Sequence, residues 1–414
     1  MNTSSNEHPQ FPVLHRAEWI VPVSSPPVPN GSVLTAGGRI LARGPFNQLR
    51  KDCPGQTRIA DHGRAALIPA LVNAHTHLEL SAMKGKIGLP AKNFADWLYA
   101  LFSLRSELDN DAVTEAYDRG VQELLNSGTA LFGDITNGTF MDGSPRAPER
   151  HIFLELLGFN RFSITAAMPP GIDLPSTGSA FTIVPHSTYS VSAQIIADAK
   201  TWTRARGLPF TIHTAEHEDE VEFLRNGTGF CRSLLERLGK WDPAWVAPKK
   251  TPVEYLDGLG ALDDRTILVH AVHMLDSDWN LAARRKCAVC FCPRSNRNLN
   301  VGRPSIMNAL SRSIPVSIGT DSLAGNTDLN LFAEAAYVLD NYPSINPDAA
   351  LEMITINPAR ALGHEMDFGG IEPGRKEDLL AVSLESGPDA SHLAEALIHS
   401  GRKGALKWIN PARS

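Results

Sequence analysis

The chain has 414 residues, of which 43% are hydrophobic and 20% charged, and its formal net charge is −6 at pH 7. This balance is typical of a globular protein and gives no reason to expect nucleic acid or an anionic membrane as a partner. No stretch approaches the ~20 apolar residues of a membrane span. The five cysteines are an odd number and too few for a disulfide scaffold, which favours a reducing compartment. The polar start MNTSSNEHPQ lacks a signal-peptide pattern, so we expect a cytoplasmic enzyme.

The first part of the chain is predicted to be a small all-β unit. Residues 1–10 are expected to be disordered. From residue 11 to residue 66, short β-like runs are broken by Gly and Pro. The pairs Asn30-Gly31 and Gly37-Gly38 supply turn chemistry between strand-like segments.

Residues 67–81, LIPALVNAHTHLELS, begin as an apolar run with little room for a solvated face. Such a run is typical of a strand buried on both sides. It ends in His75-Thr76-His77, and side chains at i and i+2 of a strand point to the same face. Two imidazoles at this spacing are half of a zinc or iron site, or a hydrogen-bonded pair at a strand end.

The middle of the chain then alternates apolar runs with helical patterns. Seven further apolar runs follow, at residues 128–135, 152–159, 180–186, 208–216, 265–272, 287–292 and 314–321. Eight strands alternating with helices over about 250 residues predict an α/β fold, a (β/α)₈ barrel of the TIM type. Polar residues cluster just after these runs, which is the catalytic face of such a barrel.

The last part of the chain is predicted to return to β structure. A helical segment from Pro347, PDAALEMITINPARALG, closes the barrel, which spans residues 67–362. Residues 363–414 show turns and short strands such as LLAVSL. We therefore expect residues 1–66 and 363–414 to join in one small composite β-sandwich.

Two segments have open interpretations. The connection at residues 218–264 contains KWDPAWVAPKKTP, rich in Pro and Trp, and suits either a lid or pocket wall or a solvated excursion on the rim. Cys290 and Cys292 are two residues apart and could form a metal pair, but Val289 beside them favours core packing in a buried strand.

The predicted strand ends carry an unusual set of side chains. His75 and His77 end the first strand, and the others are His186 on the fourth, His213 on the fifth, His270 on the sixth and Asp321 on the eighth. A lone histidine at a strand end is usually hydrogen-bonded core. Five histidines and an aspartate at one barrel mouth instead predict a metal site. Three imidazoles and a carboxylate leave a position free for water, as catalytic sites require.

The motifs around these residues are specific. They are NAHTHLELS, PHSTYSV, HTAEHEDEV, LVHAVHM, CPRSN and GTDS, on strands one, four, five, six, seven and eight. By them the chain resembles the amidohydrolase superfamily over nearly its whole length, in the branch of nucleobase, nucleoside and chloro-s-triazine hydrolases. The resemblance implies that one divalent metal, zinc first and iron as an alternative, is ligated by His75, His77, His213 and Asp321.

The resemblance also implies catalytic roles. His270 sits beside the metal-bound water, Glu216 shuttles protons with Asp321 sharing that work, and His186 contacts the substrate. Glu216 has an alternative role as a solvent-side residue of the acidic loop HTAEHEDEV. Binuclear members of the superfamily use a carboxylated lysine at strand four. Here that strand ends in His186 with no lysine nearby, which favours a mononuclear site.

Further substrate contacts are expected around the mouth. Glu79 lies two residues beyond His77 and is expected on the same strand face, where it suits a ring N–H or a ribose hydroxyl; a rim salt bridge is its alternative. Trp97 follows strand one and is either a substrate contact or helix core. Arg294 and Ser295 in CPRSN either hold a carboxylate or hydroxyl of the substrate or shape their loop.

Two stretches point to a substrate. HLELS and the insert FLRNGTGFCRSLLERLGKWDPAW are similar to aminodeoxyfutalosine deaminases of the alternative menaquinone pathway, which convert a 6-aminopurine nucleoside to its hypoxanthine form. Adenosine, S-adenosylhomocysteine and guanine deaminases and triazine hydrolases share most of the motifs and remain alternatives. A cyclic amidohydrolase or an inactive binding module is disfavoured. The expected partner is a small-molecule substrate, and the oligomeric state, including a homo-oligomer, stays open.

Overall fold

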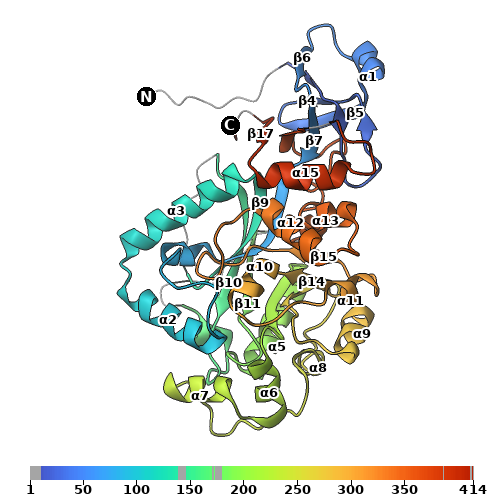
Figure 1. The fold of residues 1–414 in the computed structure, drawn as a ribbon. Coiled ribbons are helices and arrows are strands. Elements are labelled where there is room, and N and C mark those ends of the chain that lie inside the picture. The colour runs from blue at the N-terminus through green and yellow to red at the C-terminus, as the bar shows by residue number, and fades with distance from the viewer. Residues whose placement is uncertain are drawn as a thin grey trace.

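The computed structural model describes residues 11–138, 146–169, 172, 180–385, 387–410 and 413. The disorder expected for residues 1–10 lies outside these ranges. The first strands and the last strands of the chain lie together at one end of the molecule, next to a larger body of strands and helices (Figure 1). No helix among the described residues is long and apolar enough to cross a membrane.

Two sheets form the end that contains both parts of the chain. One has the order β5-β4-β1-β6 and the other β17-β16-β7-β2-β3. The strands are β1 Val13–Arg16, β2 Trp19–Ile20, β3 Val28–Pro29, β4 Gly31–Ala36, β5 Arg39–Pro45, β6 Arg58–Asp61, β7 Ala65–Pro69, β16 Leu379–Ser383 and β17 Leu406–Trp408. β16 pairs antiparallel with β7, placing Ala381 opposite Leu67, so the late strand completes the early sheet. Val33 and Ile40 of the first sheet and Leu67 of the second belong to one buried cluster.

This end of the molecule is not purely β. Helix α1 covers Phe46–Asp52, and helix α15 covers Leu393–Arg402. α15 buries Leu393, Leu397 and Ile398 and packs on α12, where a side chain at Gly401 would collide with the ring of Phe332. The expectation of turns and strands throughout residues 363–414 is therefore wrong for α15, whose apolar residues follow a helical period.

The stretch at residues 67–81 is not one strand. β7 ends at Pro69 and pairs with β16, whereas β8, Leu71–Thr76, pairs with β9 in the central body. The short 3₁₀ helix η1, Leu78–Met83, follows. The predicted boundary between residues 66 and 67 thus falls inside β7, and the chain enters the central body at Leu71.

The central body contains two four-stranded parallel sheets, β11-β10-β9-β8 and β12-β13-β14-β15. The strands are β9 Thr129–Thr136, β10 Glu149–Leu156, β11 Phe181–Pro185, β12 Phe210–Thr214, β13 Thr266–His270, β14 Ala288–Phe291 and β15 Val316–Ile318, after β8. Each of the eight overlaps one of the eight predicted runs, although β9 ends one residue after its run and β10 begins three residues before its run. At one seam between the sheets the amide of His213 donates to the carbonyl of His186 over 2.9 Å; at the other, Asp321 donates to His75 over 3.0 Å.

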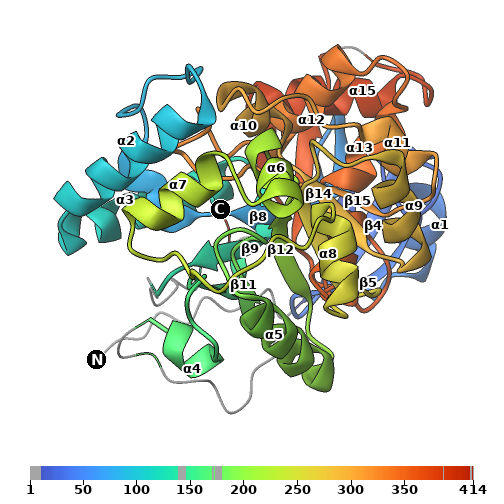
Figure 2. The same cartoon turned by 90° about the horizontal axis from the view of Figure 1, so that it is seen from below.

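Helices lie around the outside of these strands, as the view in Figure 2 shows. They are α2 Phe94–Glu107, α3 Asn110–Asn126, α4 Ile164–Ala167, α5 Ala193–Arg206, α6 Glu218–Asn226, α7 Phe230–Arg237, α8 Pro252–Gly258, α9 Asp276–Arg284, α10 Pro293–Asn298, α11 Ile306–Leu310, α12 Leu331–Asn341, α13 Pro347–Met353 and α14 Ile356–Ala361. The architecture is mixed α/β, with the strands buried under helices.

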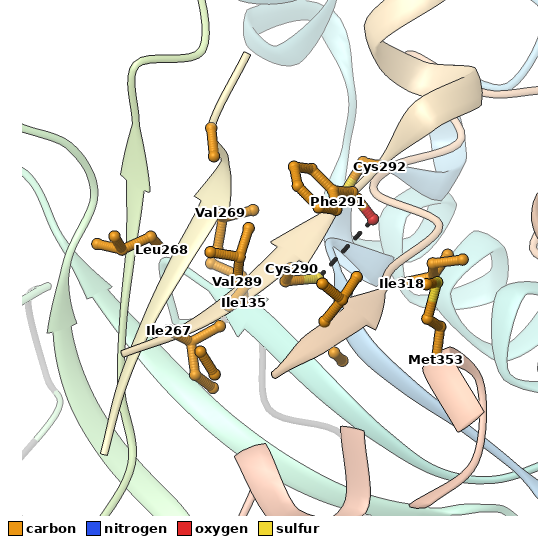
Figure 3. Close-up of a cluster of buried hydrophobic side chains, with 14 of the residues drawn as sticks. Ile135, Ile267, Leu268, Val269, Val289, Cys290, Phe291, Cys292, Ile318 and Met353 are labelled. Atoms are coloured by element: carbon orange, nitrogen blue, oxygen red, sulfur yellow. Dashed lines mark hydrogen bonds between the residues drawn. The ribbon is translucent and has the colours of Figure 1, made fainter. Parts of the chain in front are cut away.

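The core between strands and helices is apolar. Figure 3 shows Val289, Cys290 and Phe291 among the side chains of the neighbouring strands. Cys290 and Cys292 are completely buried free thiols in this cluster. The prediction that they pack in the core is confirmed.

Candidate active site

The strand ends bring the predicted histidines and Asp321 together. His75 lies in β8, and its ring centroid is 4.9 Å from those of both His77 and His213 and 5.8 Å from that of His270. The Nε2 atom of His77 is 3.4 Å from Nε2 of His213 and 3.8 Å from Oδ1 of Asp321. His186 also belongs to the cluster, with its ring centroid 4.7 Å from that of His213. The cluster therefore draws on the ends of five different strands.

Sharp backbone bends follow three of these strands. The φ angles are 50° at Ala215, 68° at His270, 51° at Ala271 and 57° at Asp321. Residues with side chains avoid this left-handed region, and where it occurs the surrounding structure must hold it. Here hydrogen bonds do so: Ala271 donates to the carbonyl of Thr214 and Asp321 to that of His75, each over 3.0 Å. The bends turn the chain across the ends of the strands.

The donor set fits a divalent metal ion. His75 is completely buried, and neither of its ring nitrogens has a hydrogen-bond partner in the described part of the chain. Burial, followed by the neighbouring His77, holds the pKa of His75 well below its usual value, so the ring is neutral, the form that binds metals. Single ligand atoms of His75, His77 and Asp321 lie within 4.8 Å of one another, as do those of His75, His213 and His270. Imidazoles with a carboxylate suit zinc or iron.

Neighbouring groups fix the orientation of these side chains. Nδ1 of His213 donates to the carbonyl of His186 over 2.8 Å, which leaves Nε2 free for a ligand. Ser295 Oγ donates to Oδ2 of Asp321 over 2.5 Å. The amide of Asn296 lies 3.0 Å from Nδ1 of His270.

Glu216 faces the cluster from the bend after β12. It is only 6% exposed, so the alternative reading of it as a solvent-side residue is wrong. Its Oε1 lies 3.6 Å from Nε2 of His270, and its backbone N–H donates to Glu220. Burial, followed by the charges of Asp321 and Glu220, raises the pKa of Glu216 well above its usual value. A buried carboxyl group with a raised pKa is a candidate general acid or base.

A cavity of about 700 Å³ opens from these residues. At one end it is lined by His77, His213, Glu216, His270 and Asp321. Its walls farther out include Phe94, Trp97, Leu98 and Leu101 of α2 and Leu234, Leu235 and Leu238 in and just after α7. Part of the connection at residues 218–264, from Leu234 to Lys240, therefore contributes to the pocket wall. Elsewhere in this connection Trp245 stacks on Phe223 with ring centroids 4.5 Å apart.

Comparison with known proteins identifies the family. The sequence profile described as "Amidohydrolase family" matches residues 66–407. The chain belongs to the amidohydrolase family.

Two curated relatives and one solved structure illustrate the likeness. This amidohydrolase is 28% identical to an aminodeoxyfutalosine deaminase of Deinococcus radiodurans, covering 82% of each chain. It is 30% identical to a 5-methylthioadenosine/S-adenosylhomocysteine deaminase of Nitratidesulfovibrio vulgaris, covering 89% of this chain and 84% of the other. Its fold is similar to that of an adenosine deaminase from Xanthomonas campestris with bound zinc, with a TM-score of 0.75, 22% identity, and 97% and 92% of the two chains covered. The chain is a hydrolase that acts on carbon–nitrogen bonds in cyclic amidines.

The predicted substrate residues of this amidohydrolase fall into two groups. Glu79, Trp97 and His186 line the cavity. The indole N–H of Trp97 donates to the carbonyl of Ala324, and Nδ1 of His186 is 2.6 Å from Ser190 Oγ. These three positions place the side chains where a substrate would bind.

Arg294 and Ser295 do not line the cavity. The guanidinium of Arg294 binds both carboxylate oxygens of Asp328, over 2.7 and 2.6 Å, and so shapes its loop. Ser295 is engaged with Asp321. The expectation that these two residues hold a substrate carboxylate or hydroxyl is not met by their positions.

Glu79 is not on the strand face that the sequence suggested. The strand ends at Thr76, and Glu79 lies in η1. Its carboxylate accepts hydrogen bonds from the guanidinium of Arg105 over 2.9 Å, from Thr136 Oγ1 over 2.8 Å and from the backbone N–H of Asn137 over 3.0 Å. The salt-bridge alternative therefore describes its contacts.

Sequence reasoning missed several cavity residues, among them Arg105, Asn137, Glu155 and Tyr189. Glu155 ends β10 as His213 ends β12, so the same rule of polar residues at strand ends applied to it. Arg105, on α2, and the loop residues carried no comparable signal.

We expect Gly319→Ala to damage the cluster, because Gly319 allows β15 to approach β8. A Cβ atom there would lie 2.7 Å from the carbonyl oxygen and 2.8 Å from the Cβ of His75. The backbone of His75 cannot move aside without disturbing β8, so the free energy of unfolding should fall by about 1–3 kcal/mol and the metal content should drop. Thermal unfolding and metal analysis measure both. Gly88→Ala, where a Cβ meets open space, is the control; equal stability of the two variants would contradict the prediction.

Proposed function

We propose that this amidohydrolase hydrolytically removes the amino group of a 6-aminopurine nucleoside, with aminodeoxyfutalosine as the first candidate. The observation that carries the proposal is the buried Glu216, 3.6 Å from Nε2 of His270, at the edge of a histidine–aspartate cluster that suits a metal ion. The deaminases among its relatives support the same reaction. We further propose that the eight central strands close into a (β/α)₈ barrel and that the two terminal sheets form one composite sandwich.

We assign the metal ligands to His75, His77, His213 and Asp321. Zinc is favoured because the similar adenosine deaminase holds zinc, and iron remains an alternative because the ligand set suits both. A bound divalent cation acts as a Lewis acid, which lowers the pKa of water to ~7.

The chain's own residues would then manage the protons. Glu216, with Asp321 sharing the work, takes a proton from the attacking water while the water oxygen bonds to C6 of the purine. It delivers that proton to the amino nitrogen, the C6–N bond breaks, and ammonia leaves. Burial, the main cause, lowers the pKa of His270 to about 3, so its neutral ring serves as a hydrogen-bond partner that orients the water.

The cavity supports a nucleoside with an extended 5′ substituent. Its volume of about 700 Å³ suits a ligand larger than a free base. The outer walls are mainly apolar, from α2 and α7, while Arg161 and Lys240 add positive charge. An apolar 5′ group with an anionic end would match these walls. Glu79, Trp97 and His186 are the substrate contacts that we retain.

Ammonia release tests the proposal. Metal-loaded protein should deaminate aminodeoxyfutalosine or another adenine nucleoside, and should be tested in parallel on guanine, cytosine and aminotriazines. Absence of turnover on all of them, with one metal bound per chain, would contradict the deaminase assignment. Mass spectrometry of the intact protein counts the metal, and two ions per chain would favour the binuclear cyclic amidohydrolases instead.

A further inference from the structure

Glu155 is a buried carboxylate at the cavity wall that the proposed reaction does not use. It lies near the end of β10 and is 5% exposed. Its Oε2 accepts a hydrogen bond from the side-chain amide of Asn137 over 3.1 Å. Its Oε1 is buried and has no hydrogen-bond partner in the ranges that the structure describes. A buried acceptor without a donor is costly, so native structures seldom leave one unused.

One neighbouring donor, the ring of His213, is already committed. Nδ1 of His213 lies 3.6 Å from Glu155 Oε1, but it also lies 2.8 Å from the carbonyl oxygen of His186. A ring nitrogen carries at most one proton, and the shorter contact takes it. Glu155 Oε1 therefore keeps its lone pairs free.

The other glutamate that we retain as a substrate contact differs in this respect. Both oxygens of Glu79 are occupied, by Arg105 on one side and by Thr136 and Asn137 on the other. The side-chain amide of Asn137 also donates hydrogen bonds to the backbone carbonyl and to the carboxylate of Glu155. These bonds fix the Glu155 side chain at the cavity wall. Between these two, Glu155 is the one with an acceptor ready for a ligand.

The chemistry of the substrate decides what that ligand atom is. The ring nitrogens of adenine in a nucleoside are acceptors, and its only base donor is the amino group that leaves. The remaining donors are sugar hydroxyls. Glu155 approaches His213 from its Nδ1 side, whereas Nε2 of His213 faces His77 in the cluster. A carboxylate oxygen of Glu155 also lies within 4.8 Å of ligand atoms of His77 and His213, so Glu155 borders both the cluster and the cavity.

We infer that Glu155 accepts a hydrogen bond from a ribose hydroxyl of the nucleoside and so determines specificity for the ribose over its deoxy forms. This inference rests on the proposed nucleoside deamination. A site built around a hydrogen bond to a substrate hydroxyl rejects analogues that lack the donor.

The test compares three nucleosides: 5′-deoxyadenosine, 2′,5′-dideoxyadenosine and 3′,5′-dideoxyadenosine. In the native protein we expect kcat/KM to fall roughly 10- to 100-fold for at least one dideoxy compound. In Glu155→Leu, which has no acceptor, the ribo and deoxy substrates should be used equally. Glu155→Gln keeps a neutral acceptor and should retain part of the preference, so it carries the test if the leucine variant fails to fold.

Glu149→Gln is the matched control, because it makes the same substitution at the other end of β10. It should keep the native preference. A Glu155 variant that slows all three nucleosides by the same factor would overturn the inference, since that is what a purely structural role predicts. A native metal content of two per chain that falls to one in Glu155→Gln would also overturn it, with Glu155 then a metal ligand beside His77 and His213. Absence of turnover on every adenine nucleoside would instead refute the proposed function.

Discussion

Replacing Glu216 with glutamine is expected to lower turnover by roughly 10²- to 10⁴-fold while leaving metal content unchanged. Glutamine preserves the size of the side chain but cannot carry a proton from water to the leaving amino group. Glu216 is buried at the cavity wall and lies 3.6 Å from Nε2 of His270. Burial, as the main cause, raises its pKa well above the usual value, so the carboxylate binds a proton more strongly than an exposed glutamate does.

Single-turnover measurement of ammonia release, alongside metal analysis, checks this prediction. Glu218→Gln is the matched control, because it makes the same substitution two residues later, at an exposed position in the first turn of α6. It should behave like the native protein. If Glu216→Gln kept most of the native activity, another group would have to shuttle the proton.

Substitution of His75 by asparagine is the second large effect, and it should abolish metal binding and activity together. His75 lies between His77, His213 and His270, and both of its ring nitrogens are buried without hydrogen-bond partners among the residues described. Removal of a hydrogen bond that supports a metal ligand lowers metal affinity roughly 10- to 100-fold. Loss of a direct ligand should lower the affinity further. Chelation of the native protein should have the same effect on activity, reversed by added zinc.

Thermal unfolding gives a readout that does not depend on catalysis. A ligand that binds only the folded state stabilises it, by an amount that grows with the logarithm of the ligand concentration divided by Kd, and so raises the unfolding temperature. Zinc added to the chelated native protein should therefore raise that temperature, and zinc added to His75→Asn should not. His62→Asn, in a histidine pair with His15 in the terminal region, is the control and should respond to zinc like the native protein. An unchanged zinc response in His75→Asn would remove His75 from the ligand set.

The cluster of strand-end residues was predictable because its logic is local. Each of the eight apolar runs overlaps a strand of the central body, and parallel strands bring their carboxyl ends to the same side. His75, His213 and His270 each lie at or next to a strand end, so the sequence alone placed them near one another. The helix α15 also carried a readable signal, the helical spacing of Leu393 and Leu397, which the expectation of a β unit overlooked.

Other features depended on partners distant in the sequence. Arg294 was expected to face the substrate, but Asp328 holds its guanidinium in the loop. Glu79 was expected on a strand, but the chain leaves the strand at Thr76, and Arg105 and Thr136 then bind its carboxylate. No periodicity in the sequence reveals which distant donor satisfies a given carboxylate.

The stretch at residues 67–81 shows the division between the two sources of information. The sequence determined that it is buried and that it ends in a pair of histidines, because apolar content and residue identity are local properties. Only the tertiary structure divided it into β7 and β8, because a buried apolar run looks the same whether it pairs with one sheet or two. Tertiary structure likewise decided that the stretch from Leu234 to Lys240 lines the cavity and that Glu155 keeps a free acceptor. Both depend on which atoms from other parts of the chain lie opposite, a property that folding creates and the linear pattern does not contain.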